Sequence, residues 1–160
     1  MTVPYPTDLP CRPGVTSERR VICAAFDMWD RLRGDSDLPD IAELDLSQYP
    51  RIAPHVYVVR LARELAHSVI VHSGPVLNQA FGISCEGLTL AEVMPISYRE
   101  QLMGYVASVM IYRKPLAETD VIIEREGKEL IHRNVLMPAS DHGGHKVTHL
   151  LCAFSCRPVS

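Results

Sequence analysis

Residues 55–72 read HVYVVRLARELAHSVIVH and contain two short segments rich in β-branched and aromatic residues. The segments are HVYVVRL at residues 55–61 and SVIVH at residues 68–72, and a polar connection at residues 62–66 separates them. This composition is typical of β-strands, and the short connection favours an antiparallel pair. The stretch therefore predicts a hairpin that begins a β-sheet.

Three further strand-like segments lie in the last third of the chain. Residues 118–125 and 128–137 flank the pair Glu126-Gly127, in which glycine can adopt the positive φ that tight hairpins favour. A looser turn at residues 141–144 leads to a fifth segment at residues 147–155. Together with the first hairpin, these segments predict a five-stranded antiparallel sheet.

The middle of the chain carries the signals of helices. A serine-glycine-proline sequence at residues 73–75 can begin a short helix at residues 76–81, because serine accepts amide hydrogen bonds at a cap. Gly82 can end this helix, since glycine tolerates the positive φ of a helix exit. We therefore expect a helix of about two turns directly after the second strand.

Two pairs of residues have the spacing of capping boxes, which satisfy free amides at a helix start. Thr89 with Glu92 predicts a brief helix, and Ser97 with Glu100 predicts the start of a long helix at residues 98–113. The apolar residues of the long helix recur at helical spacing and form its expected buried stripe. They are Leu102, Tyr105, Val106, Val109 and Met110.

An amphipathic helix is predicted at residues 18–33, ahead of the sheet, with Gly34 as its terminator. We leave two interpretations of its apolar stripe open. The stripe can cap the sheet of its own subunit, or it can form a homodimer interface with the same helix of a second subunit. The residues assigned to the dimer interface are Val21, Ile22, Ala25, Phe26, Trp29 and Leu32.

The chain is expected to divide into three parts. Residues 1–17 form a flexible arm, because four prolines fix or interrupt its backbone. Residues 18–54 form the helix and an irregular linker, and residues 55–157 form the core. The fold class is α+β, with a five-stranded antiparallel sheet, helices over one face and the N-terminal amphipathic helix.

This order of elements resembles a PAS domain. The resemblance extends to short motifs of a bacterial PAS subfamily that carries a W-x-x-L-R-G helix and an L-P linker before the sheet. The match covers about residues 19–156, with Ser73 in place of the usual alanine and Thr89 in place of serine. The matching segments are FDMWDRLRG at residues 26–34, LP at 38–39, SG at 73–74, AFG at 80–82 and GLTL at 87–90.

The resemblance implies a role in signal transduction. Since no kinase, cyclase or DNA-binding segment follows Ser160, we expect a stand-alone sensory module that signals through contacts with a partner protein, as yet unidentified. No nucleophile or acid-base set is apparent, so we do not expect an enzyme.

Composition narrows the classes of partner and the compartment. The net charge is -3 from interspersed charges, which disfavours binding to nucleic acid or to an anionic membrane. No apolar run approaches the roughly 20 residues that cross a bilayer. Five cysteines at irregular spacing and no apparent signal peptide indicate a reducing cytoplasm.

Three cofactor chemistries were considered, and no cofactor or metal is predicted. His145 and His149 have metal-ligand spacing, but a strand would separate them by about 13 Å. The sequence around Cys85 lacks the residues of light-sensing flavin-binding PAS relatives. Haem is the alternative reading, because some PAS sensors bind it through a histidine. The long helix has no histidine, so the remaining candidates are His67, His72 and His132.

The expected fold also implies a pocket between the long helix and the sheet, for a small apolar ligand or filled by side chains. The alternation of strand residues leaves open which set faces inward. The assigned lining residues are Val58, Ile70, Met103, Tyr105, Val106, Met110, Ile123, Val135 and Leu151.

Overall fold

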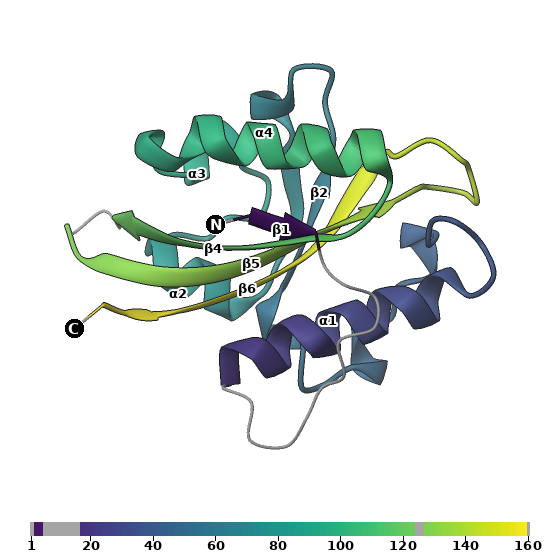
Figure 1. The fold of residues 1–160 in the computed structure, drawn as a ribbon, viewed down its shortest axis with the longest axis horizontal. Helices are drawn as coiled ribbons and strands as arrows, with labels where there is room; N and C mark the ends of the chain where they lie inside the picture. The colour runs from purple at the N-terminus through teal and green to yellow at the C-terminus, as the bar shows by residue number, and fades with distance from the viewer. Residues whose placement is uncertain (1, 5–16, 124–126, 160) are drawn as a thin grey trace.

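Figure 1 shows the computed structural model of the chain, in which residues 2–4, 17–123 and 127–159 are described. An antiparallel sheet forms the central layer, with helix α1 (Ser17–Arg33) on one face and helix α4 (Ile96–Tyr112) on the other. Helices α2 (Pro75–Phe81) and α3 (Leu90–Val93) pack on the same side as α4. We call the two surfaces of the sheet the α1 face and the α4 face.

The five predicted strands are confirmed, and a sixth is added at the edge of the sheet. The strand order is β1-β4-β5-β6-β2-β3. The sixth strand, β1, comes from the segment expected to be a flexible arm, and residues 1 and 5–16 of that arm lie outside the described residues. The strands are β1 (Thr2–Pro4), β2 (Val56–Arg60), β3 (Val69–Ser73), β4 (Leu116–Ile123), β5 (Glu129–Ala139) and β6 (His149–Pro158).

One of the two predicted capping boxes is confirmed. The Thr89 side chain accepts from the Glu92 amide and the Glu92 carboxylate accepts from the Thr89 amide, at the start of α3. The prediction that Ser97 and Glu100 cap the long helix is wrong, because α4 begins earlier, with Pro95 at its cap position and no side-chain cap. Proline fixes φ without needing an amide partner, so the chain enters the helix two residues sooner.

Strand register places alternate residues on opposite faces of the sheet. On β6, Leu150, Cys152 and Phe154 face α4, whereas Leu151 and Ala153 face α1. A register shift between Val58 and Val59 accompanies the pairing of β2 with β3. The sheet thus separates two hydrophobic cores, one under each set of helices.

Helix α1 packs on the sheet of its own chain, as the first of the two interpretations of its apolar stripe expects. Ile22, Ala25, Phe26 and Trp29 are buried against residues of the α1 face. The Trp29 Nε1 group donates to the Pro138 carbonyl over 2.8 Å, at the end of β5. These four side chains are therefore unavailable to a second subunit in this conformation, and only Val21 and Leu32 of the assigned dimer interface remain partly exposed.

The linker after α1 is tied to the far end of the sheet. The Ile41 amide donates to the Ser140 carbonyl over 2.8 Å, and the Ser140 amide donates to the Pro39 carbonyl over 2.9 Å. A 3-10 turn at Ile41–Glu43 follows within this linker. No helix within the described ranges is both long and apolar enough to cross a membrane.

Candidate functional site: a buried polar cluster under helix α4

Five polar side chains lie inside the otherwise apolar core between α4 and the sheet. Glu118 and His132 are 2% and 0% exposed, and Asn134 and the two tyrosines are also buried. We call Tyr57, Tyr98, Glu118, His132 and Asn134 the polar cluster. Buried polar groups are costly in an apolar core unless they are hydrogen-bonded, so their arrangement is informative.

Strand register explains how these residues meet. Glu118 on β4 lies opposite Asn134 on β5, and His132 is the next residue of β5 on the same face. Tyr57 on β2 reaches this face from the other side of β6, and Tyr98 comes from the first turn of α4. The cluster therefore links three strands, β2, β4 and β5, and the long helix.

Glu118 is the centre of the cluster. The Tyr98 hydroxyl donates to Glu118 Oε1, and His132 Nε2 lies 2.9 Å from the same oxygen. A second pair lies beside it, in which the Tyr57 hydroxyl donates to Asn134 Oδ1 over 2.8 Å.

Aromatic rings enclose the imidazole of His132. The Phe154 ring is stacked on it, with centroids 5.7 Å apart and planes at 13°, and the Tyr98 ring meets it edge-on at 4.9 Å. Phe81 from α2 contacts Phe154 in turn, at 5.8 Å between centroids. These rings hold the imidazole away from water.

Two atoms of the cluster have no hydrogen-bond partner within the described part of the chain. They are Glu118 Oε2 and His132 Nδ1, and both are buried. An unsatisfied buried polar atom costs about 1–3 kcal/mol, and such atoms are uncommon in folded proteins. The core therefore keeps hydrogen-bonding capacity that its own fold does not use.

Burial keeps two weakly acidic side chains of this core, those of Tyr57 and Cys152, neutral. It raises the pKa of Tyr57 well above its ordinary value, with a further contribution from the thiol of Cys152. Burial also raises the pKa of Cys152, against the opposing effect of its hydrogen bond with Tyr57. Since a nucleophilic cysteine must be a thiolate, Cys152 is suited to hydrogen bonding and not to covalent chemistry.

The predicted pocket residues divide between the two faces of the sheet. Ile70 and Val106 are buried in the α4 core, and three half-buried side chains pack against it: Met103, Tyr105 and Met110. The assignment was wrong for Val58, Val135 and Leu151, which lie on the α1 face because they belong to the opposite alternate set. The side chain of Ile123 lies outside the described residues.

Of the polar cluster, the sequence singles out only His132, as an atypical haem ligand. A signal for the others is present in β5, where Leu130, His132, Asn134 and Leu136 alternate and therefore share a face. Two polar residues within an apolar alternate set indicate a buried polar site. Recognising it requires knowing that this set faces the core.

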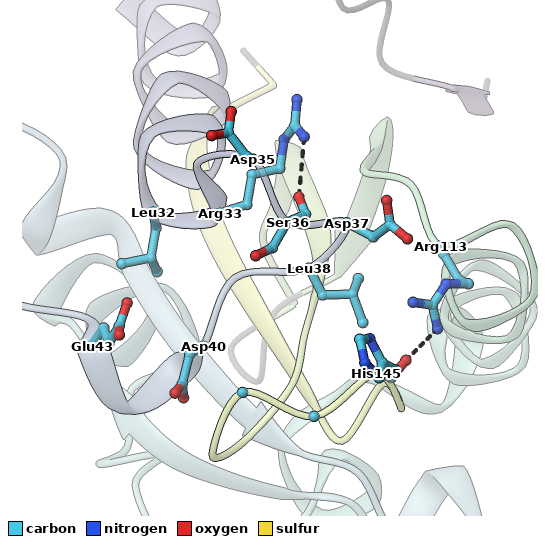
Figure 2. Close-up of a pocket in the computed structure, with 12 residues that line it drawn as sticks. Leu32, Arg33, Asp35, Ser36, Asp37, Leu38, Asp40, Glu43, Arg113 and His145 are labelled. Atoms are coloured by element: carbon cyan, nitrogen blue, oxygen red, sulfur yellow. Dashed lines mark hydrogen bonds between the residues drawn. The ribbon is translucent and has the colours of Figure 1, made fainter.

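An open hollow lies away from the polar cluster, at the opposite end of α4. Figure 2 shows this cavity of about 390 Å³ between the end of α1, its linker, the end of α4 and the β5–β6 loop. Arg113 donates to the His145 carbonyl over 2.5 Å at its rim, and Arg33 donates to the Ser36 carbonyl over 3.2 Å. The polar side chains here are mostly exposed, in contrast to those of the polar cluster.

The remaining histidines considered for cofactor binding lie apart from the core. His67 is exposed and lies 3.2 Å from Glu64, and His72 is half-buried on β3. His145 is exposed, and His149 on β6 is half-buried beside Thr148. Among the described residues, no three His, Cys, Asp or Glu side chains are grouped so that they could hold a metal ion.

Comparison with known proteins identifies solved structures that have a similar fold. No family model and no curated protein matches the sequence. An RNA-binding light-oxygen-voltage receptor superimposes with a TM-score of 0.54 and 14% identity, over 97% of this chain and 38% of that one. A Rhodobacter sphaeroides LOV protein gives a TM-score of 0.52 at 12% identity, over 73% of this chain and 70% of that one.

VqmA bound to DPO gives a TM-score of 0.55 at 16% identity, covering 71% of this chain and 58% of that one. This chain thus spans well under half the length of the RNA-binding receptor. At these identities the likeness establishes the fold, which is the α+β fold of PAS and LOV domains.

Proposed function

We propose that this chain is a PAS-type sensory module that passes a signal to protein partners. The observation that carries the proposal is the polar cluster, with its unpartnered Glu118 Oε2 and His132 Nδ1. An apolar core of the same shape would be more stable without these groups, so their presence favours a functional role over a structural one.

The proposed sensing region is the α4 core. A ligand there would contact apolar side chains such as Val106 and Met110, and it could complete the hydrogen bonding of the cluster. The fold likeness to VqmA, whose structure contains DPO, supports a small-molecule role. We therefore propose a small, largely apolar ligand with one or two polar atoms.

The proposed output is contact with another protein. The last turn of helix α4 exposes two large apolar side chains, those of Ile111 and Tyr112, which are 72% and 73% exposed. Exposed apolar side chains that gather on one element favour a contact surface. A homodimer also remains part of the proposal, as does membership of the bacterial stand-alone subfamily.

The experiment for the ligand is a thermal-shift screen, on the full chain, of small neutral compounds that are largely apolar and have one or two polar atoms. A ligand held by the polar cluster raises Tm for the wild type and for His67→Gln, an exposed control, but raises it much less for His132→Gln. Equal shifts in all three proteins, or no shift with any compound, would contradict a ligand site at the cluster.

The experiment for self-association is native mass spectrometry of the full chain, together with light scattering. We expect a dimer that Ile111→Ser and Tyr112→Ser weaken while the chain stays folded. A monomer at every concentration tested contradicts the homodimer.

The alternative proposal is a haem-dependent sensor with His132 as the iron ligand. His132 is the buried histidine of the described chain, which favours it over the exposed His67. Haem ligation through Nε2 would have to break the contact with Glu118. We expect no visible absorption band that depends on His132 after haem addition, and a band that His132→Gln abolishes would support the alternative.

A further inference from the structure

We propose that Glu118 and His132 hold one proton between them in the folded protein, and that loss of this proton releases α4 from the sheet. The protonation state is a property of the fold alone. Its use as a signal rests on the proposed sensory function.

Glu118 and His132 form a buried pair that can hold a further proton. Both side chains are 0% exposed, and the Glu118 carboxylate and the His132 imidazole share a contact of 2.9 Å. Glu118 Oε1 accepts from Tyr98 and contacts His132 Nε2, which leaves Oε2 and Nδ1 as the two positions where a further proton can reside.

The neighbours of the pair determine whether it can carry a net charge. The groups that face it are Tyr98 from α4, Tyr57 from β2, Asn134 opposite Glu118, the thiols of Cys152 and Cys156 on β6, of which Cys156 lies opposite His132, and the rings of Phe81 and Phe154. The neighbouring acid on β4, Asp120, is half-buried and accepts from the Val121 amide. The described contacts of the pair include no arginine or lysine.

A net charge on the pair would thus have no compensating partner, and burying an uncompensated charge is strongly unfavourable. Two states have zero net charge: a neutral acid beside a neutral imidazole, and a carboxylate beside an imidazolium. Both contain one proton more than a carboxylate beside a neutral imidazole. The fold therefore retains that proton.

Retention of this proton makes the stability of the folded chain depend on pH. In an unfolded chain, glutamate and histidine lose their protons near pH 4.3 and about pH 6.5. Between these values the folded and unfolded chains bind the same number of protons on this pair. Above about pH 6.5 the folded chain binds one more, so stability falls as pH rises, by about tenfold in the unfolding constant per pH unit.

Helix α4 is the element that responds to loss of the proton. Tyr98 lies in its first turn and donates to Glu118, and the neighbouring Arg99 donates to the carbonyls of Ala91 and Met94. Once the pair carries a net negative charge, water must reach it to lower the cost. Movement of the α4 start away from β4 opens that route.

The experiment is urea unfolding of the full chain between pH 5.5 and 8.5. We expect the unfolding constant of the wild type to be level near pH 6 and to rise about tenfold per pH unit above pH 7. Glu118→Gln removes the carboxyl group, so a neutral imidazole beside it needs no extra proton, and the variant should abolish that rise. The control His67→Gln alters an exposed pair, with side chains 67% and 76% exposed, and should keep it. A wild-type slope equal to that of Glu118→Gln overturns the proposal.

A measurement on the wild type keeps the test valid if the variants do not fold. At pH 7.5, infrared spectra of glutamate-labelled protein and NMR spectra of histidine-labelled protein should show either a protonated buried carboxyl group or one imidazolium. Detection of neither overturns the proposal. If the proton is found but the hydrogen-exchange protection of α4 is the same at pH 6 and pH 8, the release of α4 is wrong. Both results are independent of any ligand or partner.

Discussion

The packing around Gly74 leaves no room for a side chain larger than hydrogen. Its amide donates to the Val56 carbonyl over 2.8 Å. A Cβ atom at this position would lie 2.5 Å from the Pro54 carbonyl oxygen and 2.9 Å from that of Val56. Both obstacles are backbone atoms, so neither can rotate away.

Gly74→Ala should therefore destabilise the protein by about 1–3 kcal/mol, as overpacking does elsewhere. Gly104→Ala is the matched control, because a Cβ atom at Gly104 has nothing within 4 Å and the residue lies inside α4. The control should stabilise the protein by about 0.5–1 kcal/mol. Urea unfolding measures both changes, and equal stabilities for the two variants would contradict the close approach at Gly74.

Cys152 and Tyr57 predict a second pH dependence, at alkaline pH. Their pKa values are raised by burial, so both stay neutral in the folded chain, while the unfolded chain ionises near pH 8.5 at the thiol and about pH 10 at the phenol. The folded chain then binds more protons, and stability falls above about pH 8.5 by about 1.4 kcal/mol per pH unit for the thiol.

Cys152→Ala should make the decline between pH 8.5 and 10 shallower by the thiol's contribution, about 1.4 kcal/mol per pH unit, and Tyr57→Phe should make it shallower above pH 10. Tyr112→Phe is the control for the phenol, since Tyr112 is 73% exposed. The measurement is the unfolding free energy at each pH, because the slope is independent of any packing cost of the substitutions. A slope unaffected by Cys152→Ala contradicts the prediction.

Helix α1 is an integral part of the fold of the single chain. Its inner side is buried on the α1 face, while its outer side is charged and exposed at Asp27, Asp30 and Arg31. The two sides favour docking on the sheet of the same chain over an apolar contact with a second helix.

A chain that begins at Asp35 should therefore lose its cooperative unfolding, bind hydrophobic dyes and aggregate, because the α1 face becomes exposed. Trp29→Ala in the full chain should cost about 3–5 kcal/mol, and Asp27→Ala on the outer side should change little. Calorimetry and light scattering test this. A folded, monomeric chain from Asp35 would instead show that α1 serves only association.

The sheet joins both cores at the scale of the whole molecule. Every strand from β2 to β6 contributes residues to the α4 core, and β2, β5 and β6 also contribute to the α1 core. Because the same strands are needed by both layers, neither core can be lost without disturbing the other.

We therefore expect one unfolding transition for the described fold. Trp29 is the sole tryptophan of the sequence, so its fluorescence reports the α1 core, while far-UV circular dichroism reports all elements. The two midpoints in urea should coincide at neutral pH. A fluorescence transition at lower urea would show that α1 detaches independently.

The sequence by itself determined the order of the elements. Five strands, the long helix, the N-terminal helix and the Thr89 capping box follow from local periodicity and cap chemistry. These signals act within a few residues, so they can be read without knowing the partners of a segment. The sequence also singled out the apolar stripe of α1, although not what it packs against.

The tertiary structure alone decided which face each residue occupies. A shift of one residue in register exchanges the two faces of a strand, which is why Val58 and Leu151 were assigned to the wrong core. The same long-range pairing brings Tyr98, Glu118 and His132 together from three separate elements. Their shared burial, and the unused hydrogen-bonding capacity that results, arise only when α4 closes over the sheet.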